Sequence, residues 1–178
     1  VFLFSGTYNS LVTAEERVTE AWSQVETQYQ RRMDLYDNVV SVIKGSADFE
    51  KSTLESVIQA RSQASSINVD AENLSPEAIQ QFQQSQSQLS SAMSRLLVTV
   101  ERYPELKTTQ AFQDFQVQIE GTENRINKAR NDYNQIVRTY NTKIKRFPTN
   151  IFAALFGFDK KGYFEADTGA EDAPNIEF

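Results

Sequence analysis

Apolar residues recur along most of this chain at intervals of three, four and seven positions, the spacing that places them on one face of an α-helix. Four segments show the pattern, at residues 8–32, 35–66, 76–103 and a last one that starts near Thr108 or Thr109 and ends at 147. In the last segment the repeat averages about 3.5 residues, which is typical of helices that pack along their length at shallow angles. No stretch of useful length alternates apolar and polar residues as a β-strand would. The pattern therefore predicts an all-α protein.

Residues that begin or end helices sharpen these boundaries. Ser75 followed by Pro76 marks the start of the third helix, and Pro104 ends it. Asp34 is the expected N-cap of the second helix. Gly45 interrupts that helix, because a glycine inside a helix costs about 1 kcal/mol relative to alanine. The pattern leaves two alternatives open: the first two segments are separate helices, or they form one long kinked helix.

Helices of these lengths, joined by short connections, predict an antiparallel up-and-down bundle of four long helices. At ~1.5 Å per residue they would measure roughly 37, 48, 42 and 57 Å. A short apolar C-terminal segment follows the fourth helix up to residue 158. Residues 159–178 carry six acidic side chains against two lysines, so we expect an acidic, flexible tail there. The expected organisation is a terminal piece at 1–7, the bundle at 8–158 and the tail at 159–178.

The composition excludes most catalytic chemistry. The chain contains no cysteine and no histidine, so disulfides, thiolate nucleophiles, the commonest metal ligand and the usual general base are all missing. Dinuclear carboxylate centres in helical bundles need Glu-x-x-His pairs, and Glu120 and Glu123 are instead expected on a solvated face. Neither a G-x-S-x-G motif nor a phosphate-binding glycine loop is present. We predict no enzyme activity, no catalytic residue, no cofactor and no metal site. The net charge of −6 argues against a nucleic-acid partner.

Nine short stretches carry a family resemblance, and they occur in order from residue 8 to residue 166. They are Tyr8–Val12, Ala21–Glu26, Gln28–Arg32, Thr53–Glu55, Ala60–Arg61, Glu101–Lys107, Glu120–Ile126, Phe147–Ile151 and Tyr163–Glu165. With these stretches the sequence resembles the LemA family. The resemblance implies a bacterial protein with a single N-terminal membrane anchor, a bundle of long helices and no established enzymatic activity. Asp37 stands where the family often has a proline.

The same resemblance gives an expected location and an interpretation of the first residues. It places the protein at a bacterial membrane through an anchor that lies outside this chain. Residues 1–7 would then be the remnant beside that anchor. Their apolar start, Val1 to Phe4, is far too short to span a bilayer, and it could equally be an end that packs on the bundle.

The end of the fourth helix is the first candidate surface. Seven basic residues and one acidic residue lie between positions 125 and 146, and an apolar stretch follows. Near an anionic membrane each basic side chain contributes about 1 kcal/mol, and aromatic side chains insert beside them. The candidates for membrane contact are Arg138, Lys143, Lys145, Arg146, Phe152 and Phe156. The alternative is structural: cations complement the dipole at a helix C-terminus, and the two phenylalanines close the bottom of the core.

The turn after Tyr103 is the second candidate surface, with Glu105 and Lys107 as candidates for partner contact, because loops on rigid scaffolds often bind partners. The leading hypothesis is a scaffold or protein-interaction module that binds other membrane or envelope proteins. The alternative is a module that binds a lipid surface through its basic end.

Three further residues are expected to matter for packing. Gly121, inside the fourth helix, is expected to allow a close approach of two backbones together with Thr122. Trp22 and Tyr29 are expected in the core, with their polar ends at the rim of the bundle.

Overall fold

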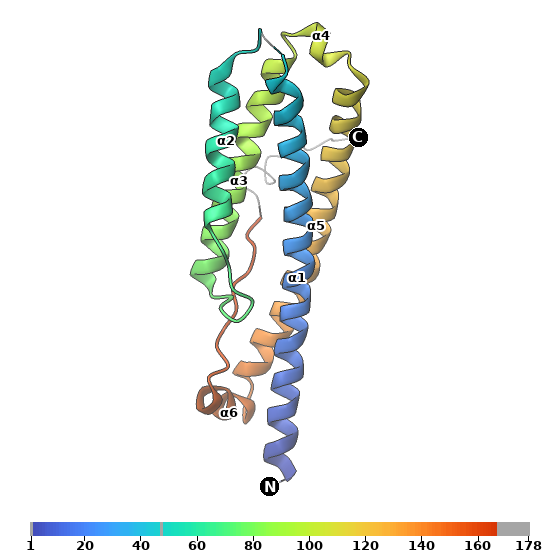
Figure 1. Ribbon diagram of the computed structural model, residues 1–178. Helices are drawn as coiled ribbons and strands as arrows, with labels where there is room; N and C mark the ends of the chain where they lie inside the picture. Colours follow the sequence, from blue (N-terminus) through green and yellow to red (C-terminus); the bar gives the residue numbers. More distant parts are fainter. Residues whose placement is uncertain (1, 47, 167–178) are drawn as a thin grey trace, which may run out of the picture.

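The computed structural model describes residues 2–46 and 48–166. These residues form helices and no strand, so the all-α prediction is confirmed (Figure 1). The helices are α1 (Phe2–Lys44), α2 (Lys51–Ser66), α3 (Pro76–Val100), α4 (Pro104–Lys107), α5 (Gln110–Lys145) and α6 (Thr149–Phe156).

Helix α1 is one continuous helix that absorbs the first third of the expected second helix. The expected N-cap at Asp34 is wrong: this side chain is exposed and accepts a hydrogen bond from Gln30 Nε2 at 2.8 Å, one turn earlier in the same helix. The apolar face continues through this position, with Tyr36, Val39 and Ile43 all buried. The helix instead ends at Lys44, because the next residue, Gly45, disfavours helical structure.

Two of the expected helix starts are confirmed by their caps. Ser75 Oγ accepts a hydrogen bond from the Ala78 N–H at 3.2 Å, and α3 begins at the next residue, Pro76. Thr109 Oγ1 accepts from the Phe112 N–H at 3.3 Å and precedes α5. Each cap satisfies one of the amide donors that the first turn of a helix leaves free. The expected turn after Tyr103 contains the short helix α4.

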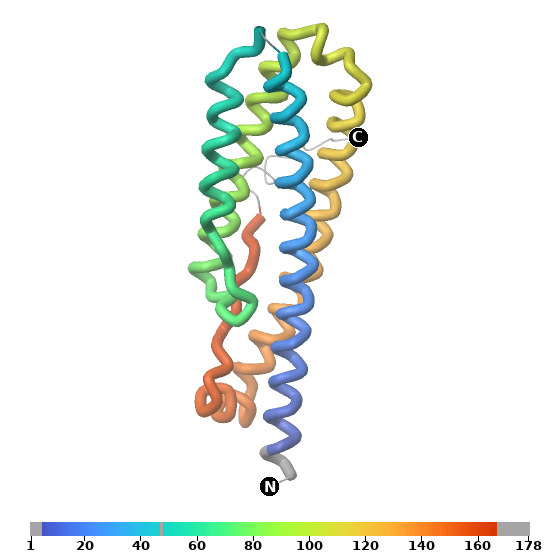
Figure 2. Tube along the Cα trace, in the orientation of Figure 1, coloured from blue at the N-terminus to red at the C-terminus, as the bar shows by residue number. Residues whose placement is uncertain are grey.

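The long helices associate as two pairs, α1 with α5 and α2 with α3 (Figures 1 and 2). Along the chain, α1 runs up the view of Figure 1, α2 runs down, α3 up and α5 down. The lengths expected for the first two helices, roughly 37 and 48 Å, are wrong, because α1 has 43 residues and α2 only 16. As a result α1 and α5 extend below the other pair, and α6 packs against their lower ends.

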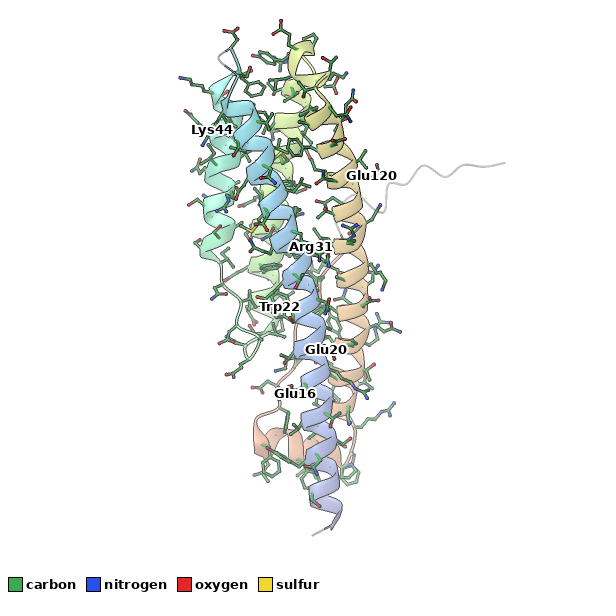
Figure 3. All side chains as sticks on the ribbon, turned by 45° about the vertical axis from the view of Figure 1, so that its right-hand side comes forward. Glu16, Glu20, Trp22, Arg31, Lys44 and Glu120 are labelled. Atoms are coloured by element: carbon green, nitrogen blue, oxygen red, sulfur yellow. The ribbon has the colours of Figure 1, made fainter. Side chains whose placement is uncertain are left out.

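The core consists of two apolar clusters, one above the other. Trp22 and Tyr29 belong to the lower cluster with a buried fraction above nine-tenths, so their predicted core position is confirmed. The expected rim position of the polar end is wrong for Trp22, whose Nε1 is buried. Trp22 lies in the lower half of α1, between the levels of Glu20 and Arg31 (Figure 3). The upper cluster lies among α1, α2, α3 and the start of α5, with Leu89 and Leu96 completely buried.

After α6 an extended segment, residues 158–166, runs back up along the helices (Figures 1 and 2). We call this segment the strap. Phe158, Lys161 and Phe164 are buried in it, so the expectation of a flexible tail from residue 159 is wrong as far as Ala166. The remainder of that expected tail, 167–178, lies outside the described residues.

The close backbone approach expected at Gly121 is not there. A β-carbon at Gly121 would meet no atom within 4 Å, so Gly121 lies on an open side of α5, although Thr122 beside it is buried. The close approach occurs at Gly162 in the strap, where a β-carbon would lie 2.8 Å from Pro76 Cα and 2.9 Å from Ser75 O. Only glycine fits there without a shift of the α3 N-terminus or of the strap.

Candidate functional site

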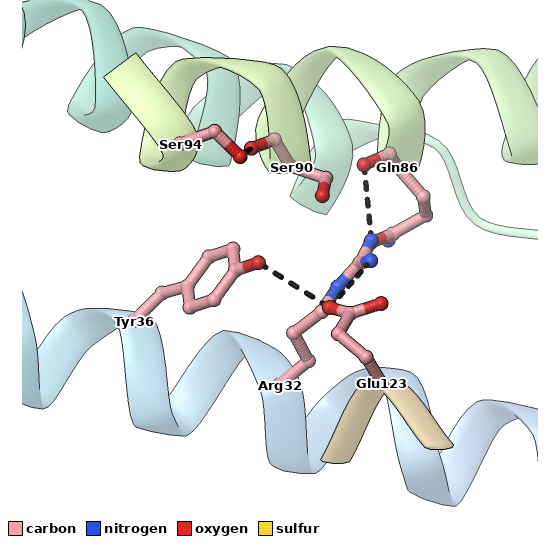
Figure 4. A network of polar contacts seen from close by, with 6 residues as sticks. All are labelled: Arg32, Tyr36, Gln86, Ser90, Ser94 and Glu123. Carbon is pink, nitrogen blue, oxygen red and sulfur yellow. Dashed lines mark hydrogen bonds and ion pairs between the residues drawn. The ribbon is translucent and has the colours of Figure 1, made fainter. Parts of the chain in front are cut away.

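A buried arginine at the centre of the molecule is the most unusual polar feature of the fold. Arg32, on α1, is 4% exposed. Its Nη2 donates to Gln86 Oε1 at 2.7 Å and to the Gln86 backbone oxygen at 3.0 Å, and its Nη1 lies 3.3 Å from Glu123 Oε1 (Figure 4). Tyr36 Oη donates to the same carboxylate oxygen at 3.4 Å. Three helices therefore meet through one guanidinium group.

The environment of this network is partly closed to water. Burial raises the pKa of the Tyr36 phenol, and the nearby Arg32 charge opposes that rise. Arg32 Nε is buried without a hydrogen-bond partner among the described residues, while the guanidinium carbon lies 4.8 Å from the centre of the Tyr29 ring. Contact with an aromatic face partly replaces the lost hydration of the cation.

A groove of about 450 Å³ opens beside the network, between α3 and α5. Serine hydroxyls line its α3 side, and Ser90 and Ser94 face the network in Figure 4. Three arginines, Arg32, Arg95 and Arg130, and a single carboxylate, Glu123, supply its charge. Grooves between helices are common ligand-binding positions in helical proteins. This groove is polar and carries a net positive charge.

Sequence reasoning missed Arg32 and the groove. The one available signal was Gln86, a polar residue at an apolar position of α3, which is 3% exposed and accepts two hydrogen bonds from Arg32. A buried polar residue requires a partner, because burying an amide without a hydrogen bond is costly. The sequence could not identify that partner, since Arg32 lies 54 positions away.

The strap is held by side-chain amides that bind its backbone. Asn141 donates to the Lys161 carbonyl at 2.9 Å and accepts from the Lys161 N–H at 3.0 Å. Asn134 makes the same pair of bonds with Phe164, both at 2.8 Å. Gln83, on α3, does so with Glu165, at 2.9 and 3.0 Å. Each amide therefore supplies the donor and the acceptor that a neighbouring β-strand would offer to an extended backbone.

Two strap side chains occupy specific pockets. The Phe164 ring lies among aromatic rings of the lower core, 5.4 Å from the Tyr133 ring and 6.2 Å from the Trp22 ring, and the Arg130 guanidinium lies 5.2 Å above it. Lys161 is 7% exposed, and its Nζ lies 2.7 Å from Glu15 Oε1. The strap is thus bound in the manner of an extended peptide ligand.

The lower end of the molecule exposes a cluster of large apolar side chains, which we call the α6 surface. Its exposed fractions are 81% for Phe147, 56% for Ile151, 72% for Leu155 and 50% for Phe156. The partly exposed Tyr8 of α1 joins it, with its ring 5.0 Å from the Phe156 ring. The described start of α1 and the α6 surface therefore lie at the same end (Figure 1).

The structure separates the six membrane-contact candidates into two groups. Arg138, Lys145 and Arg146 are exposed, and Phe156 is half-exposed on the α6 surface. Lys143 instead donates to the Ser10 backbone oxygen at 2.6 Å and to the Ser10 hydroxyl, and Phe152 packs against the lower core. The last two residues therefore have structural contacts of their own.

The partner-contact candidates lie on α4, at the opposite end. Both Glu105 and Lys107 are exposed, and Lys107 Nζ forms an ion pair with Glu101. That pair is solvent-exposed on both sides, so its contribution to stability is small.

Two general findings complete the description of the sites. Among residues 2–46 and 48–166, no group of three carboxylate, histidine or cysteine side chains lies close enough to hold a metal ion. No helix of the described part of the chain combines the length and the apolar character needed to cross a bilayer.

The fold and these sites define an all-helical protein with a polar interhelical groove, an internally bound strap and an exposed apolar end. The chain belongs to the LemA family, whose model matches residues 21–178. It is 28% identical over 165 residues to Protein LemA of Metamycoplasma hominis, covering 93% of this chain and 72% of that protein. It is also 27% identical over 190 aligned positions to Magnetosome protein MamQ 1 of Paramagnetospirillum magneticum, covering 95% of this chain and 68% of that protein. Magnetosome protein MamQ of Magnetospirillum gryphiswaldense is 26% identical with the same coverage.

Proposed function

We propose that this chain is the non-catalytic helical domain of a membrane-associated bacterial envelope protein, and that its α6 surface rests on the lipid bilayer. The observation that carries the proposal is the exposure of four large apolar side chains around α6, at the end where α1 begins. The family relationship to LemA supports the membrane-associated class.

The sequence of α6 explains why its outer face is apolar and exposed to solvent. All but two of its eight residues, Thr149 and Asn150, are apolar. One face packs on the lower core through Ala153 and Phe152, which leaves Ile151 and Leu155, four positions apart, on the opposite face. A helix that is apolar on both faces requires a second apolar environment.

The energies are sufficient for reversible surface binding. Moving the exposed area of each large apolar side chain out of water is worth about 1–2 kcal/mol. Lys145 and Arg146 are exposed immediately before α6, and each adds about 1 kcal/mol at an anionic surface. Lys143 is excluded from this estimate because it is bonded to Ser10.

Vesicle flotation tests the proposal. We expect the protein to float with vesicles that contain anionic lipid and to float less with neutral ones. Leu155→Asp should abolish flotation, whereas Val117→Asp should not, although both side chains are 72% exposed. Replacing Lys145 and Arg146 by glutamine should weaken binding about 30-fold at low salt. The same change at Lys44 and Lys51 is the charge control: both are exposed, and they lie where α1 ends and α2 begins, at the far end of the molecule (Figure 1). Equal flotation of the two aspartate variants would refute the proposal.

A scaffold that binds other membrane or envelope proteins is the second candidate. It is favoured by the open groove between α3 and α5 and by the exposed Glu105 on α4. Cross-linking in cells that carry the anchored protein, followed by mass spectrometry, tests this role. We expect one or two dominant partners whose recovery falls on Glu105→Lys but not on Glu77→Lys, a matched exposed glutamate at the start of α3.

A further inference from the structure

The side chains that bind the strap follow a regular spacing on α5. Asn141 binds Lys161 and Asn134 binds Phe164. Seven helical residues rise about 10.5 Å, and three extended residues advance about 10 Å. An asparagine every seven positions on α5 therefore meets every third residue of an antiparallel extended peptide.

The next position in this series is Asn127, seven residues before Asn134. It lies in the groove between α3 and α5, and its exposed side chain has no hydrogen-bond partner among the described residues. On the facing helix, Gln83 binds the last part of the strap, and Ser87 and Ser90 continue the polar stripe along α3. The groove thus extends the track that already holds a peptide backbone.

The charge of the groove selects the kind of peptide. Arg95 is exposed in the groove, and its side chain forms no ion pair with any residue of the described part of the chain. The single carboxylate of the groove, Glu123, is already shared by Arg32 and Tyr36. An acidic side chain can pair with Arg95, whereas a basic one would be repelled by it.

We propose that the groove between α3 and α5 binds an extended acidic segment of a partner protein, with Asn127 pairing its backbone and Arg95 its carboxylates. This gives a chemical class to the partner of the scaffold role proposed above, and it does not depend on the α6 surface.

Fluorescence anisotropy with the full chain and no vesicles tests the inference. The probe is a short labelled peptide in which glutamate alternates with serine, and the comparison peptide has lysine in place of glutamate. We expect saturable binding of the acidic peptide only. Arg95→Glu should weaken it at least about tenfold at low salt, and Asn127→Leu about fivefold, the equivalent of one lost backbone pair.

Matched controls separate the groove from general charge effects. Arg102→Glu and Asn124→Leu alter exposed residues outside the groove and should change binding less than about twofold. The vesicle-binding variant Leu155→Asp should bind the peptide normally, so loss of one activity does not imply loss of the other. Absence of saturable binding, equal binding of the lysine peptide, or equal losses in the control variants would overturn the inference.

Discussion

Replacing Gly162 by alanine should detach the strap and strongly destabilise the protein. The new β-carbon would lie 2.8 Å from Pro76 Cα, 2.9 Å from Ser75 O and 3.0 Å from Ile79 Cγ1. Two of these atoms belong to the backbone at the start of α3, which is fixed by the Ser75 cap, so they cannot move aside cheaply. The strap must move instead.

The size of the effect follows from the contacts that such a shift breaks. Gly162 donates its N–H to the Leu74 carbonyl at 2.8 Å, and its own carbonyl accepts from Tyr133 Oη at 3.1 Å. Overpacking a filled site costs about 1–3 kcal/mol, and each lost hydrogen bond about 1 kcal/mol. We expect Gly162→Ala to lower the free energy of unfolding by about 2–4 kcal/mol.

Urea unfolding followed by tryptophan fluorescence measures this change. The chain has one tryptophan, and the Trp22 ring stacks at 6.2 Å on the strap residue Phe164, so the signal reports on the strap directly. Gly121→Ala is the matched control: with open space at that position, it should raise the free energy of unfolding by about 0.5–1 kcal/mol. A Gly162→Ala protein within about 0.5 kcal/mol of the parent, with unchanged tryptophan emission, would refute the steric reasoning.

Three further predictions concern buried polar groups. Tyr133→Phe should lower the free energy of unfolding by about 1–2 kcal/mol, because it leaves the Gly162 carbonyl without its donor. Tyr140→Phe should be neutral or stabilising, since the Tyr140 hydroxyl has no partner among the described residues. Thermal unfolding of the two variants tests this difference. Burial raises the pKa of the phenols of both residues and of Tyr36 in the folded state. Their contribution to stability is therefore complete below the ordinary phenol pKa of about 10 and is lost as the pH rises above it. Absorbance at 295 nm should show these phenols ionising at the pH where the protein unfolds. Ionisation of all tyrosines before unfolding would contradict the prediction. Glu123→Ala should destabilise by about 3 kcal/mol, because it leaves the buried Arg32 charge without its carboxylate. A change of less than about 0.5 kcal/mol in urea unfolding would show that the ion pair is not what stabilises this region.

Local patterns determined most of the helices of this protein. The spacing of apolar residues identified the helical segments. Ser75 marked the start of α3 correctly, because a cap depends only on the next three residues, and the cap of α5 is at Thr109, one of the two expected positions. The same patterns failed at Asp34, where a good capping residue lies inside α1. There the buried face on both sides, with Met33 and Tyr36, outweighs the local preference.

Tertiary structure alone decided the sites. Arg32 and Gln86 are distant in sequence, and so are Asn134 and Phe164; polar residues of this kind are common, so no spacing reveals which of them meet. The strap shows the same limit, since acidic composition predicted a flexible tail. Phe164 is instead buried among aromatic rings of α1, α3 and α5, and the buried Lys161 pairs with Glu15 of α1. The amino-acid sequence by itself determined which segments are helical and which chemistry is missing, because both depend on near neighbours or on composition. Contacts between distant segments decide which polar groups pair, which glycine has no room for a β-carbon and which apolar face stays exposed. These contacts exist only in the folded chain.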